Sequence, residues 1–305
     1  MRPVSQGLNG PVAERKALDA TAYGAMLLLA ALWGFQQAAI KITAPEVSLL
    51  MQGAIRSLAA TLLVLVWAWY RGIPLFTRDG TLWAGIGAGL LFGAEFALIY
   101  GGLAHTNVSR MTVFVYLTPP LTALGVHFFV PGERLTPVQW TGVCVSFAGL
   151  VLAFSEGFAS DKATWVGDLC GLVAALLWAA TTVLIRRTRL AAAPPAKTLF
   201  YQLAVSAALM YLCSKGLNEP GVVSLSALAL ASLTYQAVAV AFASYLAWFW
   251  LLSRYLAARL SVMSFLTPMF GVLSGVLLLS ESLSARFVLA ALLIGGGIVL
   301  VNLRK

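Results

Sequence analysis

Charge is scarce in this sequence. Asp, Glu, Lys and Arg make up 10% of its 305 residues, and only 11 of these are acidic. A soluble domain carries about 25% charged residues because its surface faces water. Hydrophobic residues instead make up 60% of the chain, and the mean hydropathy is +0.89. These figures exclude a soluble enzyme, a disordered chain and a coiled coil, and they indicate that lipid surrounds most side chains.

Reactive residues are few as well. The three cysteines, Cys144, Cys170 and Cys213, lie far apart in apolar segments, which is typical of packing residues rather than of disulfides or metal ligands. There is no Walker loop, no catalytic His/Asp/Ser arrangement and no pair of catalytic carboxylates. We therefore expect no metal, no cofactor and no enzymatic activity. A lipid-modifying membrane enzyme remains an alternative from another class, although it would need clustered acid, base or metal ligands.

Long apolar runs are what the sequence does contain. A helix needs roughly 20 apolar residues to cross a bilayer core. The runs are continuously apolar, so they predict helices rather than the alternating strands of a membrane barrel. The predicted spans cover residues 20–40, 47–70, 81–104, 108–130, 136–154, 164–185, 198–214, 224–252, 257–280 and 284–303.

The net charge of +9 does not indicate nucleic-acid binding, because no basic patch is longer than residues 186–189. The basic residues instead divide unequally between the loops. With the N-terminus inside, 14 Lys and Arg residues fall on the inner side and 5 on the outer side, with Arg56 left within a span. By the positive-inside rule, this asymmetry predicts that both termini are cytoplasmic.

The two halves of the sequence resemble each other. Residues 113–119 read VFVYLTP and residues 262–268 read VMSFLTP, an offset of 149. Gly132-Glu133 is echoed by Ser280-Glu281 at an offset of 148. Five spans per half is an odd number, so the second half enters the membrane from the opposite side, as in secondary transporters. The sequence therefore predicts a cytoplasmic segment at 1–19, a first five-helix repeat at 20–155 and an inverted second repeat at 163–303.

These motifs resemble the drug/metabolite transporter superfamily. The resemblance rests on the ten spans, on Trp33-Gly34 in the first span, and on Pro119 and Pro268 in the fourth and ninth spans. It covers residues 20–303 and is nearest to the ten-helix exporters, most closely their aromatic amino acid exporter branch. It implies an all-α membrane protein, with ten helices arranged as an inverted repeat around a central cavity, that moves small metabolites outward.

Polar residues accompany a tryptophan in each half. Trp33 shares a helical face with Gln36 and Gln37, and Trp178 has Thr182 at the equivalent spacing. Such groups are costly when they face lipid, so we expect this face to line the cavity and bind substrate. Hydrogen bonding between helices, without substrate contact, is the alternative.

Aromatic residues and prolines recur at matching positions. Tyr116 precedes Pro119, and Phe265 precedes Pro268. A proline removes a backbone hydrogen bond and kinks its helix, and interrupted helices in corresponding places indicate a transport site. Packing alone could also explain the kinks. Three more aromatic candidates for substrate binding come from the third and eighth spans, where an aromatic cluster suits a flat ligand: Tyr100, Tyr245 and Phe249.

Glu95 and Arg56 are the charged residues deepest within the predicted spans, in the third and second spans. Intramembrane ionisable residues are functional candidates, usually in pairs. Glu95 could bind a substrate amino group, carry a coupling proton, or neutralise Arg56. The sequence leaves these three roles open.

Together, these features predict an integral protein of a bacterial cytoplasmic (inner) membrane that exports small organic metabolites by alternating access. Aromatic amino acids are the favoured small-molecule substrates. The alternative within transport is export of other metabolites or of flat cationic drugs, since Glu95 and the rings would suit a cation too. The expected partners are substrate and membrane lipid, without nucleic acid. The oligomeric state stays open, and a monomer is compatible with the sequence.

Overall fold

The computed structural model describes residues 16–103, 105–106, 108–155, 165–279 and 285–303. For Gln37, Val108, Ser109 and residues 274–279 it describes the backbone alone. Residues 156–162, between the two predicted repeats, and the Ser280-Glu281 motif lie outside the described residues.

The described chain is built from helices, and their bounds follow the apolar runs. In the first half they are α1 (Ala20–Thr43), α2 (Leu49–Tyr70), α3 (Leu82–Gly102), α4 (Val108–Val115), α5 (Thr118–Phe129) and α6 (Pro137–Ala153). In the second half they are α7 (Trp165–Arg187), the short η2 (Arg189–Ala192), α8 (Pro195–Gly216), α9 (Ala227–Thr234), η3 (Tyr235–Ser244), α10 (Tyr245–Arg254), α11 (Ala257–Met263), α12 (Leu266–Leu279) and α13 (Ala285–Asn302).

Within the described part of the chain, eight helical segments are long and apolar enough to cross a membrane. Two shorter apolar segments, Pro137–Ala153 and Ala257–Leu273, correspond to the predicted fifth and ninth spans. Many large apolar side chains on the outer surface are exposed, Trp69 and Trp83 to 83% and 81%. In a membrane such side chains contact lipid, so the surface agrees with a polytopic membrane protein.

Two of the predicted spans are interrupted in the middle. One breaks at Tyr116–Leu117, between α4 and α5, and the other at Ser264–Phe265, between α11 and α12. Each break lies a few residues before a proline, which cannot donate the hydrogen bond that would continue the helix. A third irregularity was not predicted: η3 is a π-helix of 10 residues. π-helical turns are rare and occur frequently at functional sites.

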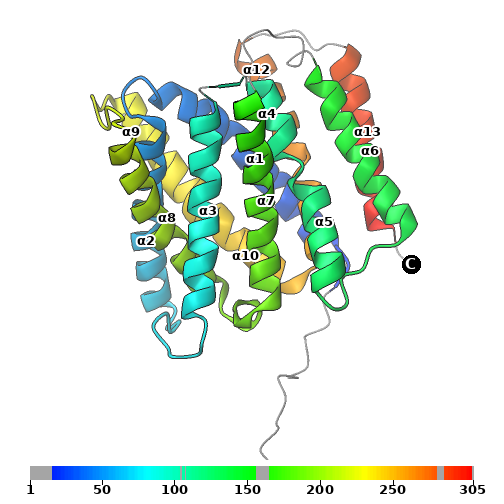
Figure 1. Ribbon diagram of the computed structural model, residues 1–305, viewed down its shortest axis with the longest axis horizontal. Helices are drawn as coiled ribbons and strands as arrows, with labels where there is room; N and C mark the ends of the chain where they lie inside the picture. Colours follow the sequence, from blue (N-terminus) through cyan, green and yellow to red (C-terminus); the bar gives the residue numbers. More distant parts are fainter. Residues whose placement is uncertain (1–15, 104, 107, 156–164, 280–284, 304–305) are drawn as a thin grey trace, which may run out of the picture.

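Helices from the two halves pack against each other throughout. α6 packs along α13 at one side of the bundle, and α3 lies against α7 and α8 (Figure 1). α1 packs on α12 and η3, while α2 packs on α8 and η3. The bundle core is therefore formed between the halves rather than within each half.

The described chain begins and ends at the same end of the bundle, here called the terminal end. The backbone N–H of Lys16 donates to the carbonyl of Arg254, 3.0 Å away. Arg259, a few residues later, donates to the carbonyls of Asn302 and Leu303 at 3.3 and 3.4 Å. This arrangement agrees with an even number of membrane crossings.

The α6–α13 contact provides a test of the packing. A Cβ atom added to Gly297 would lie 2.5 Å from the carbonyl oxygen of Gly142 and 2.6 Å from the backbone nitrogen of Ser146. We expect Gly297→Ala to lower the free energy of unfolding by about 1–3 kcal/mol, the usual cost of overpacking. Gly296→Ala is the matched control, since no atom lies within 4 Å of its added Cβ. Thermal unfolding in detergent measures both, and equal melting temperatures would contradict the expectation.

Candidate functional site

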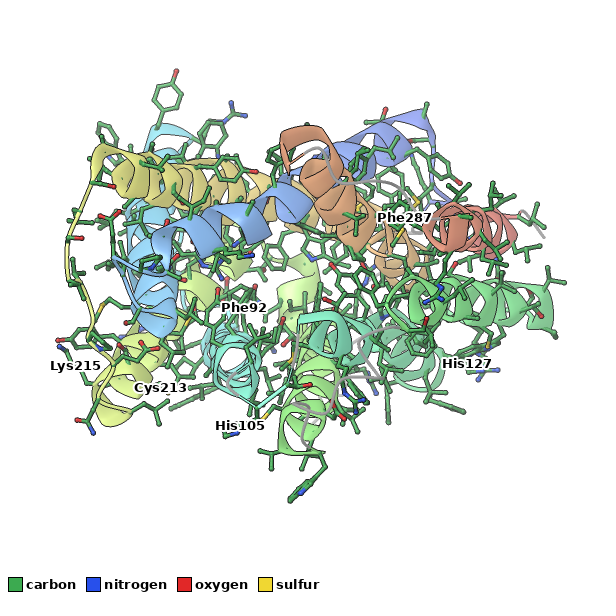
Figure 2. All side chains as sticks on the ribbon, turned by 90° about the horizontal axis from the view of Figure 1, so that it is seen from above. Phe92, His105, His127, Cys213, Lys215 and Phe287 are labelled. Atoms are coloured by element: carbon green, nitrogen blue, oxygen red, sulfur yellow. The ribbon has the colours of Figure 1, made fainter. Side chains whose placement is uncertain are left out.

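Six aromatic side chains meet in the interior, in what we call the first ring group: Trp33, Phe92, Phe96, Tyr100, Tyr245 and Trp248. The ring centroid of Phe92 lies 5.0 Å from that of Phe96 and 5.8 Å from that of Tyr245. Trp33 lies 6.3 Å from Tyr245 and 5.8 Å from Trp248. Phe92 points from α3 into the interior of the bundle (Figure 2). The group therefore joins α1 and α3 of the first half to α10 of the second half.

A second ring group consists of Tyr116, Trp178 and Phe265. The ring of Tyr116 lies 6.4 Å from Trp178 and 6.4 Å from Phe265. Tyr116 and Phe265 stand at the two helix breaks, and Trp178 comes from α7. Tyr116 also lies close enough to Glu95 and to Tyr245 to interact with them electrostatically. Because Tyr245 belongs to the first ring group, the two ring groups lie close to each other. Tyr116, Trp178 and Tyr245 are only half-buried, which leaves ring surface for further contacts.

Polar side chains of α1, α2 and η3 form hydrogen bonds inside the bundle. The indole N–H of Trp33 donates to the hydroxyl of Ser244 at 2.9 Å, at the end of the π-helix. Gln236, also in the π-helix, donates from its side-chain amide to Gln52 on α2 at 3.2 Å. Gln36 is 5% exposed, and its amide nitrogen has no hydrogen-bond partner. Of the polar face predicted around Trp33, the side chains of Trp33 and Gln36 thus point into the bundle, and the amide nitrogen of Gln36 has no partner among the described residues.

Arg56 and Glu95 lie beside the first ring group. Arg56 is 1% exposed, and its guanidinium carbon lies 4.4 Å from the centroid of the Phe96 ring. Glu95 is 3% exposed, and its Oε2 has no hydrogen-bond partner. The two are electrostatic neighbours, yet they form no salt bridge, for which a nitrogen–oxygen distance of at most 4.0 Å is required. Arg56 and Glu95 therefore interact electrostatically without a direct salt bridge.

For two further predicted site residues, the structure shows contacts other than ring stacking. Phe249, directly after Trp248 on α10, is buried and lines a small cavity together with Arg186 and Leu252. The hydroxyl of Thr182 donates to the carbonyl of Trp178, 3.4 Å away on its own helix. The side chain of Gln37 lies outside the described residues.

Sequence reasoning missed two interior residues. Phe92 contacts both Phe96 and Tyr245, and Gln236 bonds to Gln52. The repeat did not single out Phe92, because Ala241 occupies its position at the offset of 149. A signal existed nonetheless: Phe92 lies one helical turn before Glu95 and Phe96, and so on the same face.

Contacts between the two halves close the terminal end. Glu133 and Arg186 form a buried salt bridge of 3.0 Å, with side chains 2% and 1% exposed. The other carboxylate oxygen of Glu133 accepts from the backbone N–H of Ala257 at 2.8 Å, and Arg186 also donates to the carbonyl of Tyr255. A cavity of about 430 Å³ lies beside this contact, lined by Arg134, Gln139 and Arg259 among others.

Lys197, at the start of α8, adds a second contact at this end. Its ammonium group is fully buried and lies 2.7 Å from Oδ2 of Asp79. It also donates to the hydroxyl of Thr77 at 2.8 Å. The hydrogen bond from Lys197 holds the pKa of Asp79 well below its ordinary value.

The opposite end is held by carboxylates as well. Glu46 accepts from the hydroxyl and the backbone N–H of Ser226, both at 2.6 Å. Glu219 accepts from the hydroxyl of Ser48 at 2.8 Å, and Arg110 pairs with Asp168. Each of these contacts also joins the first half of the chain to the second.

This geometry defines a polytopic membrane protein with an aromatic and polar interior built from both halves. The sequence profile of the EamA-like transporter family matches residues 20–155 and 165–303, so the chain belongs to that family of membrane transporters. The family is part of the drug/metabolite transporter superfamily, as the sequence motifs indicated.

Several curated proteins are similar along almost the whole chain. A probable amino-acid metabolite efflux pump of Salmonella typhimurium is 24% identical over 89% of this chain and 91% of its own. The protein of the same description from Escherichia coli is 23% identical over the same shares. An uncharacterized inner membrane transporter of Escherichia coli is 25% identical over 93% of this chain and 91% of its own. A crystal structure with 21% identity matches with a TM-score of 0.78 over 93% of this chain and 96% of that one, which supports the fold.

The Lys197–Asp79 contact predicts a pH dependence. Because the folded-state pKa of Asp79 is depressed, its ionised form stabilises the fold above the unfolded pKa of about 4. This contribution is lost as the pH falls below about 4 towards the lower folded pKa. We expect the melting temperature of the parent protein to fall more steeply between about pH 5 and 3 than that of Asp79→Asn, which is less stable at pH 7. Parallel melting curves in detergent would contradict this reading.

Proposed function

We propose that this transporter exports small organic metabolites across the cytoplasmic membrane by alternating access, and that aromatic amino acids are its favoured substrates. The observation that carries the proposal is the meeting of two ring groups from both halves beside Arg56 and Glu95. Aromatic side chains bind a flat apolar group through edge and face contacts, while charged groups bind its polar part. The efflux-pump descriptions of the Salmonella and Escherichia relatives support the direction of transport and the amino-acid class.

An inverted five-plus-five repeat is part of the proposal. The packing supports it, because exchanging the halves maps one set of contacts onto another. The α1 contact with α12 corresponds to the α7 contact with α5, and the α2 contact with η3 corresponds to that of α8 with α3. Pairs of equivalent helices, α2 with α8 and α6 with α13, contact each other directly. Two related halves of opposite orientation supply two similar conformations open to opposite sides.

Export of flat cationic metabolites or drugs is the second candidate. The unpartnered carboxylate oxygen of Glu95, surrounded by rings, favours it. The deciding experiment uses purified protein in liposomes with labelled aromatic amino acids and labelled aromatic cations, each with and without a proton gradient. Saturable flux of the amino acids supports the main proposal. Flux of the cations alone would replace it with the second candidate.

The half-buried ring of Trp178 should contact substrate. We expect Trp178→Ala to lower kcat/KM for a transported aromatic amino acid about three- to tenfold, because a favourable aromatic pair contributes about 0.5–1.5 kcal/mol beyond its buried area. The melting temperature should change little. Trp83→Ala is the control, since Trp83 is 81% exposed on the outer surface and should have no effect on transport. A large loss of stability with Trp178→Ala would instead assign this residue to packing.

Cysteine labelling tests the proposed orientation. In a variant without native cysteines, Ala192→Cys lies at the terminal end, and Val223→Cys lies near Glu46 at the opposite end. With the termini cytoplasmic, an impermeant maleimide added to intact cells should label position 223 and spare position 192 until the membrane is permeabilised. The reverse pattern would show that the orientation is inverted.

A further inference from the structure

Arg56 is buried inside the bundle, and among the described residues it forms no salt bridge. None of its three guanidinium nitrogens has a hydrogen-bond partner in the part of the chain that the structure describes, and the side chain is 1% exposed. A guanidinium stays charged at physiological pH, and five N–H donors without acceptors are costly to bury. The face of Phe96, 4.4 Å away, offsets only part of this cost. Such a group is explained if its function is to bind an anionic group of a transported molecule.

The surroundings of Arg56 show which ligand fits. Glu95 is buried beside it with Oε2 unpartnered, and the hydroxyl of Tyr100 has no hydrogen-bond partner either. Arg56 and Glu95 are too far apart for a direct salt bridge, yet near enough to interact electrostatically. A single ligand that carries both charges close together would bridge this gap and satisfy both residues.

We infer that Arg56 binds the carboxylate of the transported molecule while Glu95 binds its ammonium group, so that the site selects α-amino acid zwitterions. This inference rests on the proposed function and deepens it by assigning a specificity-determining residue. Arginine matches a carboxylate through two parallel N–H···O hydrogen bonds. The substrate side chain then lies against the ring of Phe92 or Tyr245 and extends towards the second ring group.

The same two charges exclude other ligands. A simple aromatic amine pairs with Glu95 but leaves Arg56 unpaired, and its ammonium group is repelled by the guanidinium group of Arg56. A simple aromatic acid satisfies Arg56 and is repelled by Glu95. Leaving a buried charge unpaired is a strong means of discrimination. The site thus distinguishes the aromatic amino acids from the flat cations that the ring groups alone would accept.

The first experiment uses the unaltered protein in liposomes and therefore does not depend on how a variant folds. Counterflow of labelled phenylalanine is measured against unlabelled phenylalanine, phenylalanine amide (no carboxylate) and 3-phenylpropionate (no ammonium group). We expect each analogue to compete at least about tenfold less well than phenylalanine, the loss expected for one charge-assisted hydrogen bond. Equal competition by either analogue overturns the inference.

The second experiment assigns the carboxylate to Arg56. Arg56→Gln should lower kcat/KM for phenylalanine at least tenfold and should remove the preference for phenylalanine over its amide, whereas Arg56→Lys should keep part of that preference. Arg71→Gln is the matched control, because Arg71 also stacks on an aromatic ring (Trp67, 5.2 Å) but is exposed at the end of α2. A purely structural role for Arg56 would change the overall rate without changing the ratio of the two substrates. An unchanged ratio in folded Arg56→Gln therefore overturns the assignment.

The outcomes separate the inference from the proposed function. If no labelled aromatic amino acid is transported, the proposed function fails and the inference fails with it. If phenylalanine is transported but its amide competes equally well, export of aromatic amino acids stands and the zwitterion site alone is wrong.

Discussion

Lipid offers no hydrogen bonds, so each polar group inside these helices must find its partner within the bundle. Most of the interior polar side chains meet this requirement. Trp33 bonds to Ser244, Gln236 bonds to Gln52, and Thr43 bonds to Ser232. Each of these bonds joins the first half of the chain to the second. Polar residues between helices thus contribute to packing, as the alternative interpretation of the sequence had it.

Several of the exceptions lie together. The groups without partners include the amide of Gln36, the guanidinium of Arg56, a carboxylate oxygen of Glu95 and the hydroxyl of Tyr100. Three of them accompany the first ring group directly, and each belongs to a residue that sequence reasoning had selected as a candidate. The same region has departures from regular helix, at Tyr116–Leu117, at Ser264–Phe265 and in the π-helix η3. Unsatisfied polar groups and irregular backbone both reduce stability, and both are typical of functional sites. Their presence in one region therefore supports a binding site there.

The sequence predicted the helices well because apolar length alone determines them in lipid. Differences at their ends have local causes: α8 begins at Pro195 rather than at 198, since proline is favoured in the first turn of a helix. The helix breaks beside Pro119 and Pro268 follow from proline chemistry. Phe92 and the π-helix have no counterpart in the other half, so the repeat could not indicate them.

Both ends of the bundle are closed by contacts between the halves, yet the two ends are built differently. At the terminal end, Glu133 and Arg186 are almost fully buried and lie among further backbone hydrogen bonds. At the opposite end, Glu46 and Ser226 interact at an exposed surface, where water can replace the hydrogen bonds at little cost. The Arg110–Asp168 pair at that end is also less buried than Glu133 and Arg186, since its side chains are 17% and 14% exposed. Opening the terminal end would separate a desolvated ion pair, which is more costly than opening the other end. In an alternating-access cycle, this difference favours opening at the opposite end unless substrate or water enters to solvate Glu133 and Arg186. The cavity beside them, whose lining includes the polar side chains of Arg134 and Gln139, is placed to admit that water.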